Sequence, residues 1–498
     1  MRSIKISYKK IIDTLSENGL LISHNIKNTA QKIGGISQDS RKVSENSLLF
    51  CKGANFKGEY LYEAVQKGAV CYISETEYGA PVNHIIVKDI IKSIALMAPL
   101  YYGYPSKNLI LTGITGTKGK TTTAYFLKNI LDEFTNSKTA LSSSIEKYTG
   151  IRLEEAHLNT PELCDLQEFF YEAAFSGIKY FTMEVSSQAY KRNRLEGVKF
   201  DNGIFLNIAE DHIGEIEHLD FEDYFSCKLE FLKNCSNIII NRETDCFERV
   251  LKAAQSSDTL QALTLFGSEK IKDKCDYYYT DIKKDGKLIN FRLIGNKNGY
   301  SQNFTLKIPG LFNVENAAAA AVMSISMGVD CESIKSGLLK TEVCGRMTVL
   351  ENGEITVIVD YAHNFLSFTK LYESLRADYS GKKIISLGGA PGGKAYRRRK
   401  DFAEIVGKNS DHIYLTAEDP QYEDPVKICG EIAGYMPNVS YEIIPDRTAA
   451  VEKAVGGAKA GDVVVLLAKG DENYQKVDGK WEFYESDLKI AQRILRDL

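Results

Sequence analysis

A glycine-rich loop that contains lysine and threonine is the feature of this 498-residue chain most suited to chemistry. The loop, Thr115-Gly-Thr-Lys-Gly-Lys-Thr121, follows a short apolar run and precedes a segment with apolar residues at helical spacing. Its backbone N–H groups and the helix N-terminus can bind an anion, Lys120 can meet the outer phosphates of a nucleotide, and Thr121 can ligate Mg²⁺. Because Ile114 stands where the strict pattern has glycine, the loop is a shorter variant. We therefore predict an ATP-type site.

Two further apolar runs, at 180–183 and 203–206, each lead to a residue that can ligate a metal ion. Glu184 ends the first run, and a carboxylate at the end of a buried strand near a phosphate loop is well placed to hold Mg²⁺. His212 follows the second run beside acidic residues, so a metal-ligand role and a structural role both stay open. Lys228 lies in a predicted helix, where its sequence context alone indicates no role.

Two basic groups can bind an anionic substrate. Arg41 lies in Gln38-Asp-Ser-Arg-Lys42 and can clamp a phosphate or carboxylate, while Lys191-Arg-Asn-Arg194 is a short basic run. A solvated loop and a solvated helix end are the alternatives for these two groups, and both alternatives stay open.

The C-terminal third alternates between strand-like and helix-like segments, which is typical of a doubly wound parallel sheet. Each of four predicted strands is followed by a polar cluster, and such sheets bind ligands beyond the carboxyl ends of their strands. We therefore expect a second ligand-binding edge made by the clusters Asp360-Tyr-Ala-His363, Gly388-Gly-Ala-Pro-Gly-Gly-Lys394, Thr416-Ala-Glu-Asp-Pro-Gln421 and Ala468-Lys-Gly-Asp-Glu472.

These patterns predict an α/β protein of three domains. Residues 1–107 form a small N-terminal α/β domain, 108–343 a central P-loop ATPase-like domain with a parallel sheet, and 344–498 a C-terminal Rossmann-like doubly wound sheet. Within the central domain we expect a β-rich stretch at 236–312 with a hairpin turn at 284–287.

The composition restricts the partners. With 62 Lys and Arg against 66 Asp and Glu, the formal net charge is −4, so we expect neither nucleic acid nor membrane as a partner. The opening residues lack the apolar core of a signal peptide, and no apolar run approaches the length of a bilayer span. The ten cysteines include no C-x-x-C pair, which fits reduced thiols better than a disulfide framework or a zinc site. We expect a cytoplasmic monomer.

With these residues assembled, the chain resembles the Mur ligases, the ATP-dependent amino-acid-adding enzymes of peptidoglycan synthesis, and within them the MurE subgroup. The resemblance runs over nearly the whole chain and keeps the motif order of the family. The motifs that carry it are Asp39-Ser40-Arg41, Thr115-Gly-Thr-Lys-Gly-Lys-Thr121, Asn159-Thr160-Pro161, Glu184-Val-Ser-Ser187, Asp211-His212, Asn313 with Asn316, Gly345-Arg346 and Asp360-Tyr-Ala-His363.

The resemblance implies a role for each matching position. It implies two Mg²⁺ ions, whose ligands are Thr121, Glu184, His212 and a carbamylated Lys228. The implied catalytic residues are Lys120, Glu184, His212 and Lys228. The implied ATP-binding residues are Gly116, Thr117, Lys118, Gly119, Lys120, Thr121, Thr122, Asn316, Arg346, Asp360 and His363. The implied contacts to the UDP-muramoyl peptide, with residues 1–107 as its binding domain, are Ser40, Arg41, Asn159, Thr160, Ser186, Arg192 and Arg194.

The reaction that the resemblance implies passes through an acyl phosphate. The carboxylate of the substrate attacks the γ-phosphate of ATP, ADP leaves, and an incoming amine attacks the mixed anhydride. Positioning and charge neutralisation supply most of the catalysis. The third domain must close on the second, because Arg346 and His363 are separated from Lys120 by the predicted domain boundary.

The choice of amino acid depends on Glu418-Asp-Pro-Gln421, where relatives that add meso-diaminopimelate have Asp-Asn-Pro-Arg. Gln421 cannot make the bidentate, charge-assisted contact of arginine to a second carboxylate. The chain is similar instead to streptococcal-type enzymes that add L-lysine, with Lys394 as the partner of its α-carboxylate. The carboxylates that suit its terminal ammonium are Glu418, Asp419, Asp471 and Glu472.

Several alternatives stay open. Ornithine, diaminopimelate or another amino acid can be the substrate, and a paralogue can act on an acceptor outside the cell wall. A non-enzymatic nucleotide-binding regulator is the remaining reading. Such a regulator would be expected to have lost Lys120, Glu184 or Lys228, and all three are present.

Overall fold

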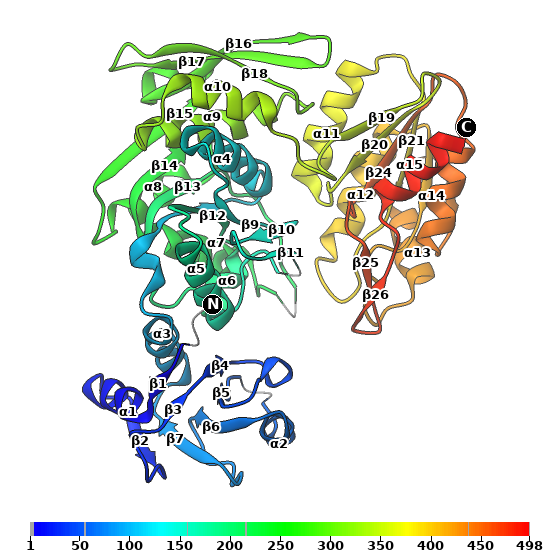
Figure 1. The fold of residues 1–498 in the computed structure, drawn as a ribbon. Coiled ribbons are helices and arrows are strands. Elements are labelled where there is room, and N and C mark those ends of the chain that lie inside the picture. Colours follow the sequence, from blue (N-terminus) through cyan, green and yellow to red (C-terminus); the bar gives the residue numbers. More distant parts are fainter. Residues whose placement is uncertain (1–3, 54–55, 157, 215–216, 437, 498) are drawn as a thin grey trace. The chain divides into compact units, whose positions relative to one another are not determined.

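The structure is a computed structural model that describes residues 4–53, 56–156, 158–214, 217–436 and 438–497 (Figure 1). The chain divides into two compact units. The first comprises Met1–Gly113, Lys138–Gly203 and Asn234–Ser236, and the second comprises Ile114–Ser137, Ile204–Lys233 and Asn237–Leu498. The predicted α/β class is confirmed. Because the two units cut through the predicted central domain, its boundaries stay a prediction.

The first unit contains a five-stranded sheet with the order β2-β7-β6-β5-β4. β4 to β7 are parallel neighbours, and β2 pairs antiparallel with β7. Ser7 caps the first helix by accepting a hydrogen bond from the N–H of Lys10, and that helix buries Ile11 and Leu15 at helical spacing. The elements are β1 Ile6–Ser7, α1 Tyr8–Glu17, β2 Leu21–His24, β3 Lys32–Ile33, β4 Gly35–Ser37, η1 Ser40–Lys42, β5 Ser47–Phe50, α2 Gly58–Gln66, β6 Ala69–Ser74, β7 Asn83–Val87, α3 Ile90–Tyr101 and η2 Pro105–Asn108.

A second sheet has the strand order β11-β10-β9-β12-β8-β13-β14-β15-β16-β17-β18. In the first unit, β9 is parallel to β12, but β10 is antiparallel to both β9 and β11. The elements of this part are β8 Ile110–Thr115, β9 Ala140–Ser142, β10 Glu146–Tyr148, β11 Leu153–Glu155, α5 Leu163–Phe175, β12 Tyr180–Glu184, α6 Ser187–Lys191 and β13 Phe200–Phe205. The sequence predicted a parallel sheet, and antiparallel strands extend it at this edge.

The second unit holds the other edge of the same strand order. β14, β15 and β16 are parallel neighbours, whereas β17 is antiparallel to both β16 and β18. The hairpin turn predicted at 284–287 is confirmed, since Asp285 pairs with Leu288 and Gly286 has a φ of +60°. The elements are α4 Lys120–Thr135, α7 Phe221–Leu232, β14 Cys235–Asn241, α8 Phe247–Gln255, β15 Ala262–Ser268, η3 Glu269–Lys274, β16 Tyr277–Asp285, β17 Leu288–Gly295, β18 Ser301–Leu306, α9 Asn313–Ser326 and α10 Cys331–Lys340.

The stretch at 236–312 contains the strands β14 to β18, as the β-rich pattern predicts, and one α-helix lies among them. Residues 247–255 form the helix α8, which buries Phe247, Val250, Ala253 and Ala254. These positions follow the helical period of 3.6, and the polar residues between them face away from the buried stripe.

The remainder of the second unit contains a six-stranded sheet with the order β19-β20-β24-β21-β22-β23. Its pairings are parallel except for the edge strand β19, which is antiparallel to β20. This confirms the predicted doubly wound sheet. The elements are β19 Thr348–Glu351, β20 Thr356–Asp360, α11 Phe365–Asp378, β21 Ile384–Gly388, α12 Arg397–Asn409, β22 His412–Leu415, α13 Pro425–Tyr435, β23 Ser440–Ile443, α14 Arg447–Gly456, β24 Val463–Leu467, β25 Tyr474–Val477, β26 Lys480–Phe483 and α15 Asp487–Asp497.

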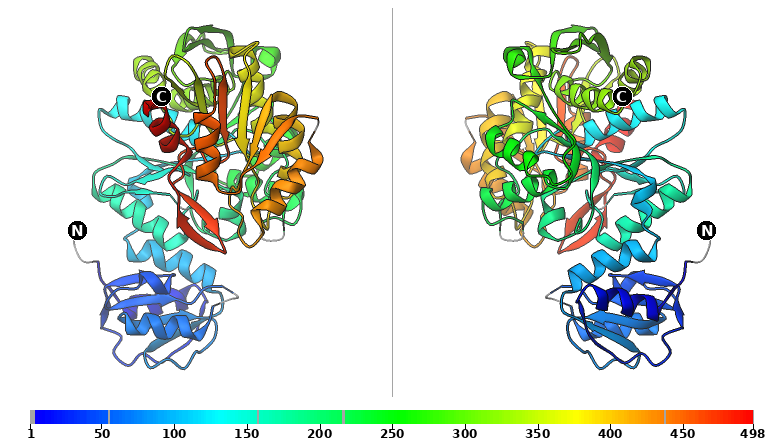
Figure 2. Two further views of the ribbon diagram at one scale, coloured as in Figure 1. Left: turned by 90° about the vertical axis from the view of Figure 1, so that its right-hand side faces the viewer. Right: turned by 90° about the vertical axis from the view of Figure 1, so that its left-hand side faces the viewer.

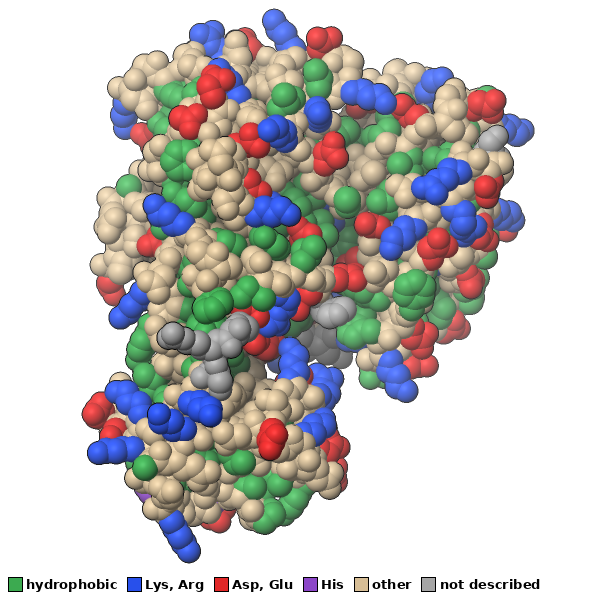
Figure 3. Space-filling view, in the orientation of Figure 1, with side chains coloured by type: hydrophobic (Ala, Val, Ile, Leu, Met, Phe, Trp, Pro, Cys, Tyr) green, Lys and Arg blue, Asp and Glu red, His purple; other side chains and the backbone are tan. Residues whose placement is uncertain are grey.

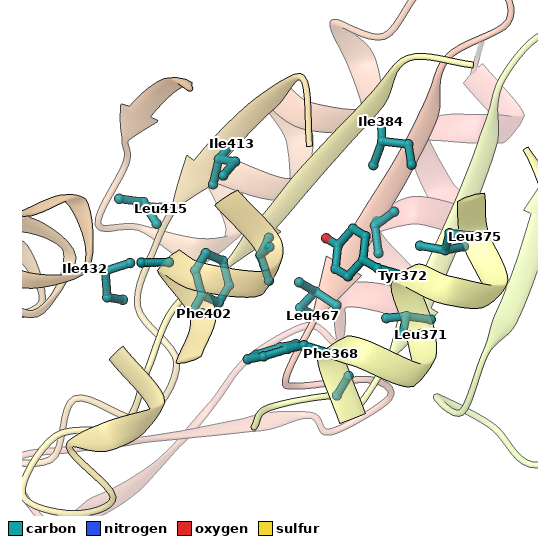
Figure 4. Packing of buried hydrophobic residues seen from close by; sticks show 14 of the residues in the cluster. Phe368, Leu371, Tyr372, Leu375, Ile384, Phe402, Ile413, Leu415, Ile432 and Leu467 are labelled. Carbon is teal, nitrogen blue, oxygen red and sulfur yellow. The ribbon is translucent and has the colours of Figure 1, made fainter. Parts of the chain in front are cut away.

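Helices cover both faces of this sheet (Figures 1 and 2). Side chains of α11, α12 and α13 pack on one face and those of α14 and α15 on the other. The central strand β24 shows why the strands read as continuous apolar runs: Val463, Val465 and Leu467 point into the first cluster, and Val464 and Leu466 point into the second. Figure 4 shows the first cluster, where side chains of α11 and α12 meet those of β21, β22 and β24.

The surface is mixed in charge. On the face shown in Figure 3, Lys and Arg side chains lie interspersed with Asp and Glu side chains, in keeping with the formal net charge of −4. Among the described residues, no helix combines the length and apolar character needed to cross a bilayer.

Candidate functional site

The phosphate loop connects β8 to α4, as the sequence predicts. Gly116 and Gly119 have φ values of +155° and +86°, and a Cβ on Gly119 would lie 2.2 Å from Oδ1 of Asn316. Only glycine therefore fits at 119. The Nζ of Lys120 donates to the carbonyl oxygens of Gly116 at 2.9 Å and Thr117 at 3.2 Å. The loop thus holds the lysine ammonium against its own backbone, at the N-terminus of a helix.

Lys228 comes to the same loop from α7. Its side chain is buried, and its Nζ donates to the carbonyl oxygen of Gly116 at 2.8 Å. The ring centroid of Tyr224, one helical turn earlier, lies 4.9 Å from this Nζ. Burial lowers the pKa of Lys228 well below its ordinary value, and the nearby cation Lys120 lowers it further. The fold therefore favours the neutral amine of a residue for which the sequence context showed no role.

A buried polar cluster joins the loop that follows β13 to the C-terminal sheet within the second unit. Oδ1 of Asp211 accepts from the guanidinium of Arg398 at 2.9 Å, and Oδ2 accepts from the amide of Asn364 at 2.6 Å. The Nζ of Lys118 lies 3.0 Å from Nε2 of His363 and 3.6 Å from Oδ2 of Asp211. The structure thus brings together Lys118 and His363, two of the predicted ATP-binding residues.

The carboxylate of Asp211 lies among several basic groups, and the pKa values of the cluster reflect this arrangement. Burial alone would raise the pKa of Asp211, but Arg398, His212 and Lys118 hold that pKa well below its ordinary value. Burial lowers the pKa of Lys118 to about 7, although Asp211 opposes the shift. Burial also lowers the pKa of His363, with Lys118 and Arg398 adding to the effect. Arg398, in the first turn of α12, was not among the predicted site residues.

Five more of the predicted ATP-binding residues lie in the second unit. Asp360 ends β20, and it accepts hydrogen bonds from the backbone N–H groups of Met347 and Ala362, both at 2.7 Å. The guanidinium of Arg346 lies 4.0 Å from the ring centroid of Tyr361. The third residue is Asn316, on α9. Thr121 and Thr122 are buried in the first turn of α4.

His212 lies in the loop after β13 with a φ of +58°. Its Nδ1 is 3.2 Å from Oε1 of Glu217. The Nζ of Lys394 is 3.9 Å from the same carboxylate oxygen. Glu217 therefore links a predicted metal ligand to a predicted amino-acid contact, although the sequence did not single it out.

In the first unit, Glu162 organises the predicted substrate residues. Its carboxylate accepts from Arg194 Nε at 2.6 Å and from Gln38 Nε2 at 2.6 Å, and Lys52 Nζ lies 3.2 Å away. Burial would raise the pKa of Glu162, but Arg194 and Lys52 lower it below its ordinary value. Glu162 was missed, and its only sequence signal is its position after Pro161 at the start of a helix.

The other predicted substrate residues of this unit differ in their surroundings. Thr160 is buried and its hydroxyl contacts the carbonyl of Glu184 at 3.0 Å and the hydroxyl of Ser186 at 3.3 Å. Arg41 is 82% exposed and forms a two-point ion pair with Asp39. The Nε of Arg192 lies 3.4 Å from Oε1 of Gln188. The remaining members are Ser40, in η1, and the exposed Asn159.

Glu184 ends β12, as the sequence predicts, and its side chain is buried. Its Oε1 accepts from the backbone N–H of Ser144 at 2.7 Å. This hydrogen bond to the ionised form orients the carboxylate at the carboxyl end of a strand.

The predicted amino-acid pocket contains a buried lysine, Lys469, whose ion-pair partners the sequence did not indicate. Lys469 is 1% exposed, and its Nζ lies 2.7 Å from Oε2 of Glu472 and 3.1 Å from Oδ1 of Asp419. Asp471 accepts from the hydroxyl of Ser486 at 2.6 Å. Lys469 therefore neutralises part of the acidity that the four predicted carboxylates suggest.

A cavity of about 700 Å³ lies next to the loop that carries Gln421, and the described residues that line it do not include the four predicted carboxylates. Gln421 lines it together with Tyr422 and with Phe483 of β26. The backbone N–H of Gln421 donates to the carbonyl of Lys476 at 2.9 Å, so the β25–β26 hairpin holds the loop that carries Gln421. The space is large enough for a small-molecule ligand.

Glu418 yields a pH-dependent prediction. Burial raises its pKa to about 7 from 4.5, and Asp419 adds to the shift while Arg398 and Lys469 oppose it. The folded protein therefore holds the proton of Glu418 more tightly than the unfolded chain does. The stability gained in this way is fully present below the ordinary pKa of 4.5 and is lost as the pH rises through about 7. We expect Glu418→Gln, which cannot ionise, to gain stability relative to the wild type between pH 4.5 and 7.

Urea unfolding of the ligand-free protein across this pH range measures the difference. Glu482→Gln, on the exposed strand β26, is the control and should follow the wild type. A constant difference between Glu418→Gln and the wild type across the range would contradict the prediction.

Comparison with known proteins identifies the family of this chain. Residues 114–324 match the Mur ligase middle domain, and residues 345–470 match the Mur ligase glutamate ligase domain. A Lactobacillus delbrueckii subsp. bulgaricus protein named UDP-N-acetylmuramyl-tripeptide synthetase is 37% identical, covering 99% of this chain and 100% of its own. An Enterococcus faecalis protein named UDP-N-acetylmuramoyl-L-alanyl-D-glutamate–L-lysine ligase is 39% identical, covering 93% of this chain and 92% of its own.

A solved structure shares the fold over the same extent. The crystal structure of MurF from Acinetobacter baumannii has a TM-score of 0.69 at 18% identity and covers 99% of this chain and 98% of its own. The two domain matches and the two relatives confirm the family resemblance inferred from the motifs. The chain belongs to the Mur ligase family of ATP-dependent ligases.

Proposed function

We propose that the protein joins L-lysine to UDP-N-acetylmuramoyl-L-alanyl-D-glutamate in the synthesis of peptidoglycan precursors, at the expense of ATP. The observation that carries the proposal is the loop between β8 and α4, where Lys120 and Lys228 both donate to the carbonyl of Gly116. Two amines from separate elements at one phosphate loop suit the transfer of a phosphoryl group. The names of the two relatives supply the substrate class.

In this proposal ATP binds the loop through Lys120 and the backbone N–H groups of residues 116–122. Lys118, with a pKa of about 7, gains its proton as phosphate oxygens approach, because added negative charge favours the cationic form. Asp360, at the carboxyl end of β20, and Arg346 contact the ribose and adenine together with Asn316.

We also infer the division of the chain into domains. Residues 1–107 bind the UDP substrate, residues 108–343 bind ATP, and residues 344–498 bind the amino acid.

Thr121, Glu184, His212 and a carbamylated Lys228 are the residues that would hold two Mg²⁺ ions. The donor set fits this metal, because a hydroxyl, a carboxylate and a carbamate supply the oxygen atoms that Mg²⁺ prefers. A neutral amine is the form that adds to CO₂, releasing one proton and leaving the carbamate anion, and burial of Lys228 favours that form. When bound, the ions would neutralise charge on the phosphoryl group.

The proposed UDP-substrate residues are Ser40, Arg41, Asn159, Thr160, Ser186, Arg192 and Arg194. Support comes from the first unit, where the guanidinium of Arg194 is held by Glu162 and also lies 3.4 Å from the carbonyl of Thr160. A guanidinium held in one orientation suits a phosphate or carboxylate of the substrate.

The reaction proceeds in two steps. A carboxylate oxygen of the D-glutamate residue bonds to the γ-phosphorus of ATP, and the bond to the β–γ bridging oxygen breaks to release ADP. The amine of lysine then bonds to the acyl carbon, loses a proton, and expels inorganic phosphate as the amide forms. Lys120 neutralises charge on the phosphoryl group, and fixed positions of the reactants lower the entropic part of the barrier.

For the amino acid, we infer that Lys394 binds the α-carboxylate and that the acidic cluster binds the side-chain ammonium. Gln421 at the wall of the cavity offers no charge to a second carboxylate. The contacts of Lys469 leave Glu418 and Asp471 as the cluster members not paired with it, because Asp419 and Glu472 are its partners. The proposed amino-acid residues remain Lys394, Glu418, Asp419, Gln421, Asp471 and Glu472.

The decisive experiment incubates the purified protein with UDP-N-acetylmuramoyl-L-alanyl-D-glutamate, Mg-ATP and one amino acid at a time, and determines the product mass. We expect the mass of the lysine adduct, with one ADP released per adduct. Ornithine, meso-diaminopimelate and L-alanine complete the panel. Preferential formation of any other adduct would overturn the choice of lysine but leave the ligase reaction in place.

The Gln421→Arg variant tests which residue sets the specificity for the amino acid. Its guanidinium adds the missing cation at the cavity wall, so the kcat/KM ratio of diaminopimelate to lysine should rise about tenfold or more. An unchanged ratio would mean that Gln421 does not face the distal end of the amino acid. Release of no ADP with any amino acid would exclude the proposed activity.

A further inference from the structure

Three side chains in and just before the first two turns of α7 offer an imidazole, a carboxylate and a thiol, which are the ligand types that Zn²⁺ binds. His218, Asp223 and Cys227 each offer one ligand atom, and these atoms all lie within 4.8 Å of one another. Nδ1 of His218 is 3.3 Å from Oδ2 of Asp223. In a tetrahedral zinc site with bonds of about 2.0–2.3 Å, ligand atoms lie about 3.3–3.8 Å apart. A modest side-chain adjustment at Cys227 therefore completes three corners of such a site.

Local structure holds these side chains in place. Asp223 and Cys227 are four residues apart and share one face of α7. Asp220 caps the helix by accepting from the N–H of Asp223 at 2.8 Å, and the N–H of Leu219 donates to Oδ2 of Asp223 at 3.0 Å. These two hydrogen bonds fix the backbone and the carboxylate, as hydrogen bonds to a ligating side chain do in metal sites.

The histidine is equally constrained. The N–H of His218 donates to the carbonyl of His212 at 3.1 Å, and its own carbonyl accepts from the N–H of Gly214 at 2.9 Å. The imidazole is buried and meets the ring of Tyr224 edge to face at 5.4 Å between centroids. Asp223 and Cys227 are only partly buried, so solvent reaches two of the three side chains.

The three residues differ in chemistry from the proposed magnesium ligands. Mg²⁺ prefers oxygen donors in octahedral geometry, whereas thiolate and imidazole favour Zn²⁺ or Co²⁺. Cys227 directly precedes Lys228, so an ion bound here would hold the helix that delivers Lys228 to the phosphate loop.

We propose that His218, Asp223 and Cys227 form a binding site for one Zn²⁺ ion, with water as the fourth ligand, that anchors the first two turns of α7. The thiol loses its proton on binding, so one proton is released for each ion bound. This site does not depend on the proposed ligase reaction, because it is defined by residues outside the nucleotide and substrate contacts.

Cobalt is the probe for the first test. The full-length protein is stripped with a chelator, kept reduced with a phosphine, and titrated with Co²⁺. We expect a sulfur-to-cobalt charge-transfer band that saturates at one equivalent, together with the visible bands of tetrahedral Co²⁺. Cys227→Ser should lose the charge-transfer band, and Cys246→Ser, at an exposed cysteine before α8, should keep it.

Zinc affinity gives a second and independent measurement. Competition with a chromophoric chelator should show at least about tenfold weaker Zn²⁺ binding in both Cys227→Ser and Asp223→Asn than in the wild type. The Tm of the wild type should rise with Zn²⁺, and that of Cys227→Ser should not. Excess Mg²⁺ should not displace Co²⁺.

Three outcomes would overturn the proposal. They are absence of a sulfur-to-cobalt band in the wild type, persistence of that band in Cys227→Ser, and displacement of Co²⁺ by Mg²⁺. Circular dichroism of Cys227→Ser and Asp223→Asn confirms that each variant is folded before the comparison is made.

Discussion

Lys228→Ala is expected to reduce the rate of amide formation by at least about 100-fold. In the wild type the buried amine lies 2.8 Å from the carbonyl of Gly116, in surroundings that favour its neutral form. Alanine removes both the amine and the carbamate that it is proposed to form. The measurement is kcat for ADP release with the muramoyl dipeptide and lysine as substrates.

Two further variants separate the proposed anion from a purely structural lysine. Lys228→Arg keeps a long cationic side chain but cannot form the carbamate, so we expect it to be as inactive as alanine. Short carboxylates such as acetate should partly restore Lys228→Ala, because they supply the missing anion. Lys233→Ala, at the exposed end of the same helix, should retain full activity. Full activity in Lys228→Ala would remove Lys228 from the active site.

The second large effect concerns stability. Arg447→Met is expected to lower the free energy of unfolding by about 3–5 kcal/mol, because it leaves a buried carboxylate without its cation. The side chains of Arg447 and Asp487 are both 0% exposed, and two hydrogen bonds of 2.9 and 2.6 Å join them. Arg447 also donates to the carbonyls of Ala417 at 3.0 Å and Leu467 at 2.6 Å. Urea unfolding at neutral pH measures the loss.

A double variant distinguishes the lost pair from lost packing. Arg447→Met with Asp487→Leu removes both charges, so it should recover much of the stability that the single variant loses. Lys453→Met breaks an ion pair with Glu442 on the surface of the same helix and should change the stability far less. A single variant as stable as the wild type would mean that water reaches Asp487 and solvates it.

The arginine has a further consequence for the site. The carbonyl of Ala417 precedes Glu418, and the carbonyl of Leu467 ends β24 just before Lys469. One guanidinium therefore ties together the two loops that carry the predicted amino-acid contacts.

Local patterns in the sequence were sufficient to predict those helices, strands and turns whose residues follow a single spacing or turn pattern. The loop of residues 115–121 lies between a strand and a helix, and Lys228 lies in a helix, as the sequence predicts. Turn chemistry likewise placed the hairpin at 284–287. In each case the signal comes from neighbours along the chain, and neighbours along the chain are all that a sequence presents directly.

Partners from distant segments could not be predicted in this way. Lys469 pairs with Asp419, which lies fifty residues away along the chain. Glu162 accepts a hydrogen bond from Gln38, which lies over a hundred residues away. The antiparallel edges of the central sheet were missed for the same reason, because strand direction depends on which strands become neighbours. The cluster of His218, Asp223 and Cys227 also escaped notice, since only one cysteine contributes and no metal-binding spacing appears.

The sequence by itself determined the α/β class, the phosphate loop and the family, because each rests on residue types at short and fixed spacings. The tertiary structure alone decided which charges face one another, as with Asp211 between Arg398 and Lys118. It also decided which amines are buried, and hence that Lys228 favours its neutral form. The physical reason is that desolvation and Coulomb energies depend on distance and burial in space, and the order of residues along the chain sets neither.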